Sequence, residues 1–441
     1  GSEMCIRDRA TEEVTVALLG GGTVGTSVVE LLTEHAEDFR ERIGAPVRLT
    51  AVAVRDASKA RPGIPADLIT DDAVAVASSG ADIVVELMGG IEPARECILA
   101  AMAAGSSVVT ANKALLAEDG ARLFEAAEQH EVDLSFEASV AGAIPLLRPL
   151  RESLAGDRVR KVMGIVNGTT NFMLTKRDEE GVEYADVFAE ADALGYLESD
   201  PSLDVDGHDA AAKAAILAEL AFHTRVTLAD VHVEGIADVT ADDMAAARDM
   251  GFVIKLLAIA EKIDDSEDSG VIVRVHPTML PRTHPLAAVR ESFNAVFVEA
   301  DAAGQLMFYG RGAGGHPTAS AVLGDLVAAA RNRVSGSREP GESTYTALPV
   351  LPIGRAYTEY YVNLDVADRP GVLASVAAAF AENGVSIQVV HQEGHGDDAG
   401  LVVRTHLATD AALDATVEQL RGLDTVCRVV GVMRVEGDEQ P

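Results

Sequence analysis

The sequence predicts a mixed α/β protein with three domains: a doubly wound parallel sheet, an α+β domain and a ferredoxin-like βαββαβ sandwich. Over residues 11–150, short apolar strands alternate with helices, which is typical of a parallel sheet covered on both faces. Longer helices and mixed strands replace this pattern over residues 151–335. Residues 336–356 are rich in Gly, Ser, Pro and charge, which indicates a linker, and residues 357–437 again alternate between apolar and polar side chains.

The first domain begins at Val14 with an apolar strand, a glycine-rich turn and a helix, "VTVALLGGGTVGTSVVELLTEHAEDF". The first ten residues share no pattern with the rest of the chain, and we exclude them as a tag remnant or a wrongly assigned start. Further strands are expected in "VRLTAVAVRD", "ADIVVELMGG", "SSVVTANKALLA" and "DLSFEASVAGAIP", and helices in "ARECILAAMAAG" and "DGARLFEAAEQH". The alternation predicts helices on both faces of a parallel sheet.

The middle domain is expected to combine helices with a mixed sheet. Its segments are "VRKVMGIVNGTTNFML", "YADVFAEADALGYLESD", "DVDGHDAAAKAAIL", "VIVRVHPTMLP", "AVFVEA" and "QLMFYG". We expect the helix "PTASAVLGDLVAAARNR" to close this domain, and "VSGSREPGESTY" to begin the linker.

The last domain begins with a strand in which Val362, Leu364 and Val366 share one face. A helix, "GVLASVAAAFAEN", then ends at Gly384. Strands "VSIQVV" and "LVVRTHLAT", helix "ATVEQLRGL" and strand "RVVGVMRV" complete the βαββαβ order.

Composition excludes several classes of protein. No apolar run is long enough to span a bilayer and no secretory signal precedes the fold, so we expect a cytoplasmic protein. The three cysteines are too few and too scattered for a disulfide framework or a zinc site. A formal charge of −34 repels nucleic acid and anionic membranes, so neither is an expected partner.

The glycine-rich turn has the spacing Gly20-x-Gly22-x-x-Gly25, directly after a strand and at the start of a helix. Gly20 would allow a tight turn, Gly22 the close approach of a pyrophosphate, and Gly25 close packing of helix on strand. This context favours a Rossmann-type dinucleotide site over a purely structural turn.

The end of the second strand indicates which dinucleotide is bound. Arg55 stands where a carboxylate would bind the ribose 2′-hydroxyl of NAD, and Lys59 is close in sequence. A cation there suits the 2′-phosphate of NADP. Asp56, beside Arg55, keeps NAD as the alternative, and Arg55 could also be an ordinary solvated charge.

The stretch "DVDGHDAAAKAAIL" carries one of the chain's seven lysines. Asp209 and Lys213 are four residues apart on a predicted helix and hence share a face. The surroundings of Lys213 are apolar nearly all round the helix, so we expect it to be buried and held by carboxylates rather than to form a surface salt bridge. Such a lysine can donate a proton. The carboxylates within reach in sequence are Glu198, Asp200, Asp204 and Asp206.

Three further features are less specific. Lys113 follows the strand "SVV", at the edge of the sheet where such folds bind ligands. Glu137, in "FEASVAGAIP", could join backbone carbonyls around a hard cation or could cap a turn. A second glycine-rich loop, "YGRGAGGHPTAS", could approach a cofactor or serve as a linker.

Cys97, in an apolar helix, is expected to be a packing residue rather than a nucleophile, and His316 shows no metal-ligand spacing.

Taken together, these segments resemble the homoserine dehydrogenase family, and the resemblance covers almost the whole chain from about residue 14. It implies reversible NAD(P)H-dependent reduction of L-aspartate 4-semialdehyde to L-homoserine, on the route to threonine, methionine and isoleucine. One departure is the middle glycine of "GGG", where the family often has another residue. The segments that carry the resemblance are "GGGTVG", "TANKALLA", "FEASVAGAIP", "NGTTNF", "ALGYLESDPSLDVDGHDAAAKAAIL" and "GRGAGGHPTASAVLGDL".

The resemblance also implies roles for individual residues. Lys213 matches the family's proton donor and Lys113 its other active-site lysine, which could share the task. The implied substrate-site residues are Glu198, Asp204, Asp209 and the backbone of Gly195. The implied cofactor residues are Gly20, Gly22, Thr23, Val24, Gly25, Arg55, Lys59, Lys113, Gly312 and Gly314. A sodium or potassium ion would be held by Glu137 and the carbonyls of Val140, Gly142 and Ile144.

The last domain resembles an ACT domain, an amino-acid-sensing module, through "DVADRPGVLASVAAAFAENGVSIQVV". Its effector would lie at the loop Asp368 to Leu373 and the turn Asn383 to Ile387, usually at a dimer interface. L-Threonine is the implied effector, and a homodimer or homotetramer the implied assembly. Two alternatives stay open: a purely structural dimerisation unit, and a non-catalytic sensor that keeps NADP as a structural ligand.

Overall fold

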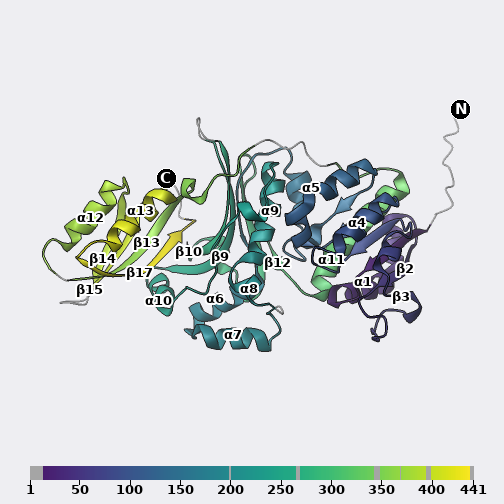
Figure 1. Ribbon diagram of the computed structural model, residues 1–441, viewed down its shortest axis with the longest axis horizontal. Helices are drawn as coiled ribbons and strands as arrows, with labels where there is room; N and C mark the ends of the chain where they lie inside the picture. Colours follow the sequence, from purple (N-terminus) through teal and green to yellow (C-terminus); the bar gives the residue numbers. More distant parts are fainter. Residues whose placement is uncertain are drawn as a thin grey trace. The chain divides into compact units, whose positions relative to one another are not determined.

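The computed structural model describes residues 13–197, 200–264, 269–341, 348–367, 369–393 and 399–437. The chain forms two compact units, each with its own sheet (Figure 1). The first unit comprises Gly1–Ala155 with Gly310–Tyr345, and the second Gly156–Tyr309 with Thr346–Pro441. Within the described residues, no helix is long and apolar enough to cross a membrane.

The first unit is built on a six-stranded sheet in which all neighbouring strands are parallel. Its strand order, β3-β2-β1-β4-β5-β6, is that of the doubly wound dinucleotide-binding fold, so the predicted fold class of this part is confirmed. The central strands are almost continuously buried because helices cover both faces. The strands are β1 (Val14–Leu19), β2 (Val47–Ala53), β3 (Ile69–Thr70), β4 (Ile83–Glu86), β5 (Ser107–Thr110) and β6 (Leu134–Ser135).

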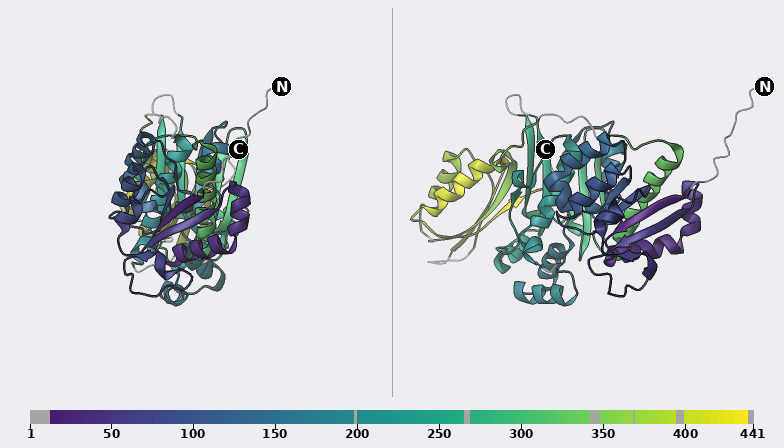
Figure 2. Two further views of the ribbon diagram at one scale, coloured as in Figure 1. Left: turned by 90° about the vertical axis from the view of Figure 1, so that its right-hand side faces the viewer. Right: turned by 45° about the vertical axis from the view of Figure 1, so that its right-hand side comes forward.

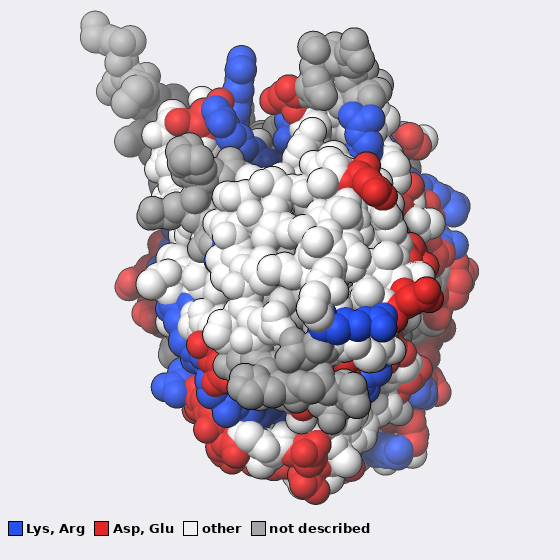
Figure 3. Space-filling model, turned by 90° about the vertical axis from the view of Figure 1, so that its left-hand side faces the viewer, with Lys and Arg blue, Asp and Glu red and all other residues white. Residues whose placement is uncertain are grey.

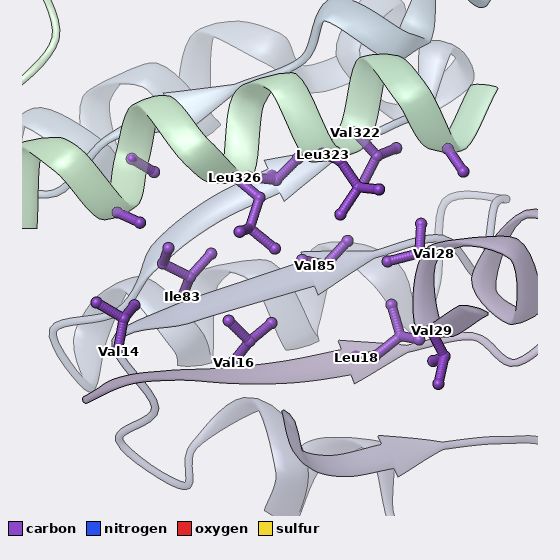
Figure 4. Packing of buried hydrophobic residues seen from close by; sticks show 14 of the residues in the cluster. Val14, Val16, Leu18, Val28, Val29, Ile83, Val85, Val322, Leu323 and Leu326 are labelled. Carbon is purple, nitrogen blue, oxygen red and sulfur yellow. The ribbon is translucent and has the colours of Figure 1, made fainter. Parts of the chain in front are cut away.

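One helix of this unit comes from far along the chain. The helix α11 (Gly315–Ser335) packs its apolar side, Val322, Leu323 and Leu326, on the sheet beside Ile83 (Figure 4). We expected this helix to close the middle domain, and the structure instead groups it with the first unit. The other helices are α1 (Thr23–Glu34), α2 (Ala36–Ile43), α3 (Ala73–Ala77), α4 (Ala94–Ala103) and α5 (Lys113–Gln129).

The expected linker begins as part of the first unit. The Glu339 amide donates to the Asp133 carboxylate at 2.9 Å, and the Glu339 side chain accepts from Ser135 and pairs with Arg151. Further on, the Leu351 amide donates to the carbonyl of Val271 in the second unit. The ends of the segment are therefore anchored, and residues 342–347 lie outside the described residues.

The second unit carries a mixed sheet that continues from the middle domain into the C-terminal domain. The strand order is β12-β11-β7-β9-β10-β17-β13-β15-β14, with β8 beside β10 and β16 beside β13. The middle-domain strands are β7 (Val159–Ile165), β8 (His232–Val233), β9 (Phe252–Ile263), β10 (Gly270–Pro281), β11 (Phe293–Ala300) and β12 (Gly304–Arg311). The helices are α6 (Gly168–Glu180), α7 (Tyr184–Ala193), α8 (Ser202–Val205), α9 (His208–Phe222) and α10 (Ala241–Asp249).

The C-terminal domain has the predicted βαββαβ order, with both helices on one face of its sheet (Figures 1 and 2). Val362, Leu364 and Val366 turn inward to those helices, as the alternation predicted. The elements are β13 (Tyr357–Val366), α12 (Val372–Glu382), β14 (Ile387–Glu393), β15 (Ala399–Thr405), β16 (Ala408–Thr409), α13 (Asp410–Arg421) and β17 (Val426–Val435). The short connecting turns with helical geometry are Ala66–Leu68, Glu137–Ser139, Pro149–Ser153, Leu228–Asp230, Pro285–Ala288 and Ile353–Arg355.

A buried ion network joins this domain to the middle-domain sheet. Arg274, completely buried on β10, donates to Glu261 at 2.6 Å and to Glu436, just after β17, at 2.8 Å. Lys161 of β7 pairs with Glu436 at 2.5 Å. Although burial opposes the charged form, these two cations lower the pKa of Glu436 to about 2. The C-terminal strand is thereby held to the middle of the sheet.

Candidate active site

Lys213 is buried on α9, with 8% of its surface exposed, as its apolar surroundings predicted. Its Nζ donates to Asp209 Oδ2 at 2.7 Å and to the carbonyl of Val166 at 2.6 Å. Asp209 is also buried, one helical turn earlier on the same face. A buried ammonium is tolerated when it is paired and hydrogen-bonded, and both partners supply that here.

Asn167 connects the acids around Lys213, and the sequence did not single it out. Its Nδ2 donates to Asp204 Oδ1 at 2.7 Å and to Asp209 Oδ2 at 2.9 Å, which brings the two acids together as expected. Its Oδ1 accepts from the Thr170 amide at 2.9 Å, so the residue also caps α6. An asparagine directly before a helix is a recognisable cap signal, but the two carboxylate contacts depend on the tertiary fold.

The other predicted acids are placed differently. Asp200 and Asp206 are exposed, and Asp200 accepts from Ser202 at the start of α8. Glu198 lies outside the described residues. Gly195 has a left-handed φ of 73° at the end of α7, and the adjacent Tyr196 carbonyl accepts from Thr169 Oγ1 at 2.8 Å. This bond holds the Gly195 turn beside the start of α6.

In the glycine-rich turn of the first unit, a side chain would fit at one glycine and would clash at two others. A Cβ on Gly20, where φ is 113°, would lie 2.6 Å from the carbonyl oxygen of Leu87. A Cβ on Gly25 would overlap the carbonyl oxygen of Gly20. A Cβ on Gly22 would meet nothing within 4 Å. Thr23 and Val24 open α1, where backbone amides have no helical partner. The turn therefore presents an open cradle of amides that suits a pyrophosphate.

Cations gather at the end of β2. Arg55 and Lys59 are exposed there, and Arg61, which the sequence did not single out, donates to the carbonyls of Asp56 and Lys59. The Asp56 carboxylate accepts from the amide and the hydroxyl of Ser58. The acid is thus engaged locally, while Arg55 and Lys59 are exposed to solvent.

The second glycine-rich loop lies beside the first within the same unit. A Cβ on Gly315 would lie 2.7 Å from Ser27 Oγ and 3.2 Å from Thr23 Cγ2, both on α1. Gly314 has a φ of 121°, which an L side chain rarely adopts. Gly312 packs its carbonyl against Gly142, so the loop also touches the segment after Glu137.

Lys113 is the first residue of α5 and is half-buried. The preceding Asn112 caps the helix through the Leu115 amide and donates to the Gly90 carbonyl at 2.7 Å. Lys113 belongs to the first unit, whereas Lys213 belongs to the second.

Glu137 is buried, and its carboxylate accepts from the amides of Leu146, Leu147 and Arg148 at 2.5, 2.8 and 2.9 Å. The structure therefore shows the capping role that the sequence offered as an alternative. Within the described residues, the carbonyls of Val140, Gly142 and Ile144 accept no backbone hydrogen bond. Carboxylate and carbonyl oxygens are the donors that Na⁺ and K⁺ prefer, so the residue types at this loop suit such an ion.

Cys97 and His316 were set aside as a nucleophile and as a metal ligand, respectively, and the structure places them as follows. Cys97 is fully buried in α4, and burial raises the pKa of its thiol to about 11, which leaves it unreactive. His316 Nε2 lies 3.7 Å from Glu30, and the His316 side chain is largely exposed. No group of three His, Cys, Asp or Glu side chains in the described part of the chain could hold a metal ion.

Comparison with known proteins identifies the family. The family model described as "Homoserine dehydrogenase, NAD binding domain" matches residues 20–137, the model described as "Homoserine dehydrogenase" matches residues 145–327, and the ACT domain model matches residues 360–425. Homoserine dehydrogenase of Corynebacterium glutamicum is 56% identical over 427 residues, 96% of each chain. That of Mycobacterium tuberculosis is 57% identical over 432 residues, 96% of this chain and 98% of the other.

Solved structures agree. A homoserine dehydrogenase from Thiobacillus denitrificans aligns with a TM-score of 0.90 and 38% identity, covering 96% of this chain and 98% of that one. A hyperthermophilic archaeal homoserine dehydrogenase, solved in complex with NADPH, aligns with a TM-score of 0.62 and 27% identity over 75% of this chain and all of that one. The resemblance inferred from the sequence motifs is confirmed, and this chain belongs to the homoserine dehydrogenases, NAD(P)-dependent oxidoreductases, and carries an ACT domain at its carboxyl end.

Proposed function

We propose that the enzyme reduces L-aspartate 4-semialdehyde to L-homoserine reversibly, on the route to threonine, methionine and isoleucine, with Lys213 as proton donor. The observation that carries this proposal is the buried Lys213 ammonium, held by Asp209 and by the Val166 carbonyl. The nicotinamide of the bound cofactor supplies the hydride. Lys213 gives its proton to the alkoxide oxygen that forms, and in the reverse direction it takes the proton back.

The acids next to Lys213 are proposed to bind the substrate's ammonium group. Asp209 and Asp204 present carboxylates that Asn167 holds together, and Glu198 is assigned to the same task from its motif position. Gly195 would contact substrate through its backbone. Lys113 could bind the substrate carboxylate or share the proton transfer.

We propose NADP as the preferred cofactor. Arg55 and Lys59 leave their charges in solvent at the end of β2, next to Arg61, which suits a 2′-phosphate. The Asp56 carboxylate is occupied by Ser58, which weakens the case for NAD. The pyrophosphate would lie on the amides of the Gly22 turn, with Gly312 and Gly314 beside it.

A monovalent cation, Na⁺ or K⁺, is proposed at Glu137 with the carbonyls of Val140, Gly142 and Ile144. Such an ion would fix the loop that follows β6. Asp325 of α11 accepts from the Glu137 amide at 2.8 Å, so the loop is also held from the helix side.

The ACT domain is proposed to bind L-threonine and to mediate a homodimer or homotetramer. The effector residues would be the loop Asp368 to Leu373 and the turn Asn383 to Ile387, although Asp368 lies outside the described residues. The face shown in Figure 3, which is the left-hand side of Figure 1, has a broad area without charged side chains. Exposed Leu373, Val389 and Val390 of this domain suit a subunit contact.

One assay tests the function. NADPH consumption is followed with L-aspartate 4-semialdehyde, then with NADH in place of NADPH, and with L-threonine, NaCl or KCl added. We expect turnover, a preference for NADPH, inhibition by threonine and activation by one of the salts. A folded protein that binds NADPH but shows no turnover would overturn the proposal in favour of a non-catalytic sensor.

A further inference from the structure

Glu86 is a completely buried glutamate to which the proposed reaction gives no task. It is the last residue of β4, where it pairs with Leu19 at the end of β1 on one side and with Thr110 at the end of β5 on the other. The strand order of this sheet reverses between β1 and β4, and doubly wound folds bind their ligands outside the carboxyl ends of the strands at that point. Glu86 therefore lies at the edge of the sheet where the dinucleotide is expected.

The Glu86 carboxylate holds the turn that follows β4, residues 87–90. Its Oε1 accepts from the amides of Met88 and Gly89 at 2.7 and 3.1 Å. Gly89 and Gly90 have left-handed φ angles of 70° and 75°, and a Cβ on either would meet nothing within 4 Å. The turn therefore presents an open stretch of backbone at the carboxyl edge of the sheet.

The same carboxylate is connected to the start of α5. Its Oε2 accepts from Thr110 Oγ1 at 2.6 Å, and Thr110 Oγ1 accepts from the Asn112 amide at 3.0 Å. Asn112 caps α5, whose first residue is Lys113, and its Nδ2 donates to the Gly90 carbonyl at 2.7 Å. These bonds form a closed chain that fixes the turn 87–90 and the start of α5 with respect to each other.

The chemistry of the side chain explains why a carboxylate stands at this position. Burying a charge costs free energy, and all three side-chain hydrogen bonds of Glu86 come from uncharged donors. A neutral side chain could hold the turn alone. Only a carboxylate, however, offers two acceptor oxygens, whereas a glutamine offers one. Glu86 thus suits the task of joining donors on two sides.

We propose that Glu86 is a positioning residue that sets the place of Lys113 and of the turn 87–90, along which the nicotinamide half of the cofactor lies. The part that concerns Lys113 rests on the proposed function. The proposed pyrophosphate site follows β1 and the proposed 2′-phosphate site follows β2, so the nicotinamide half extends to the other side of β1, over β4 and β5.

Steady-state kinetics of the full enzyme test the connection to α5. Thr110→Val removes the hydroxyl between Glu86 and Asn112, and we expect kcat/KM for the semialdehyde to fall at least roughly tenfold. Thr110→Ser keeps the hydroxyl and should stay within about threefold of the wild type. Glu86→Gln keeps one acceptor oxygen for two sets of donors, so it should lower kcat/KM as Thr110→Val does and also raise the KM for NADPH.

A double-mutant cycle at saturating NADPH separates positioning from a general loss of stability. If Glu86 acts through Lys113, the effect of Glu86→Gln on kcat/KM for the semialdehyde should shrink to less than about threefold in the Lys113→Ala background. If Glu86→Gln does not fold, the cycle uses Thr110→Val.

The matched control is Asp133→Asn. Asp133 is a buried acid of the same unit just before β6, at the opposite edge of the sheet, and it accepts from the Glu339 amide and from Asn332. Asp133→Asn should lower the melting temperature about as much as Glu86→Gln does but leave kcat/KM within about twofold of the wild type.

Three results would overturn the positioning role: an equal effect of Glu86→Gln in both backgrounds, Thr110→Ser as impaired as Thr110→Val, or a loss of kcat/KM in Asp133→Asn that matches its loss of stability. Normal kinetics of Glu86→Gln beside an impaired Lys113→Ala would refute the positioning role and leave the proposed function standing. A fully active Lys113→Ala would remove the proposed role of Lys113 and, with it, the group that Glu86 is proposed to position.

Discussion

Lys213 lies on α9 among buried alanine, isoleucine and leucine residues, and Asp209 is its acidic partner on the same helix. Replacing Lys213 by Ala should lower kcat by roughly 10²- to 10⁴-fold, the usual contribution of a general acid. The same change at Lys113 should raise the KM for substrate more than it lowers kcat if that residue binds rather than donates. Steady-state NADPH assays measure both, and near-normal turnover of folded Lys213→Ala would remove its proposed role. Lys262→Ala, on β9, serves as the control.

On the proposed function, Asn167 acts as a positioning residue, because it contacts Asp204 and Asp209 and the role of proton donor is assigned to Lys213. Asn167→Asp keeps the oxygen that caps α6 but replaces the amide donor between Asp204 and Asp209 by a third carboxylate. We expect kcat/KM to fall by roughly 10- to 100-fold, the cost of about 1 to 3 kcal/mol for lost buried hydrogen bonds, with the acidic limb of the pH profile moved to higher pH.

A merely structural role for Asn167 would look different. Asn167→Ala removes both the cap and the donor, so it should lower the melting temperature more than Asn167→Asp does. If the two variants lose stability and activity in the same proportion and the pH profile does not move, the positioning role is wrong.

Lys255 gives a test by pH. Burial lowers the pKa of Lys255 to about 8, although it donates to Asn171 and to the Val289 carbonyl. Between pH 8 and about 10 the unfolded chain keeps a proton that the folded chain has lost, so the free energy of unfolding should rise with pH relative to Lys255→Met. The expected slope is about 1.4 kcal/mol per pH unit, measured by urea unfolding of both proteins. A difference independent of pH would show that Lys255 titrates normally when folded.

At the scale of single elements, the glycines of the first turn separate folding from binding. Gly25→Ala would force α1 away from Gly20, so we expect a lower melting temperature and poor NADPH binding. Gly22→Ala meets no protein atom within 4 Å, so the melting temperature should stay unchanged while the KM for NADPH rises at least roughly tenfold, because the methyl group would occupy the pyrophosphate cradle. An unchanged KM in Gly22→Ala would place the pyrophosphate elsewhere.

Helices α11 and α10 show which features of an element the local sequence predicts and which it does not. The helix α11 was predicted as a helix from its own residues, because its apolar positions repeat with helical spacing. The apolar repeat of α11 does not predict that the helix packs on the sheet of the first unit, because any sheet with an apolar surface could cover its apolar face. The capping box of Thr240 and Asp243 at the start of α10 follows from local sequence, whereas the contact of Asp243 with Gly431 of β17 depends on the tertiary fold.

At the scale of the whole molecule, the buried ion network joins the C-terminal domain to the middle-domain sheet. Arg274→Met would leave Glu261 and Glu436 buried without their guanidinium partner, and we expect a loss of about 3 to 5 kcal/mol in the free energy of unfolding. The double variant Arg274→Met/Glu436→Gln should recover part of that loss, because one uncompensated carboxylate is gone. Urea unfolding measures all three proteins.

The comparison variant for this network is Arg428→Gln, which breaks an exposed ion pair with Asp365 on the same C-terminal sheet. Its effect should stay within about 1 kcal/mol. A similarly small effect of Arg274→Met would show that the network does not hold the domain to the sheet.

The sequence by itself determined the class of each domain, the glycine-rich turn, the burial of Lys213 and its pairing with Asp209. These depend on spacing along one strand or one helix, where 2-residue and 3.6-residue repeats fix which side chains share a face. The tertiary structure alone decided that Asn167 joins Asp204 to Asp209, that α11 belongs with the first unit, and that Glu436 reaches Arg274. Each of these depends on contacts between residues far apart in the chain. A local sequence pattern does not specify which distant residue a side chain will contact, because many residues elsewhere have the same pattern.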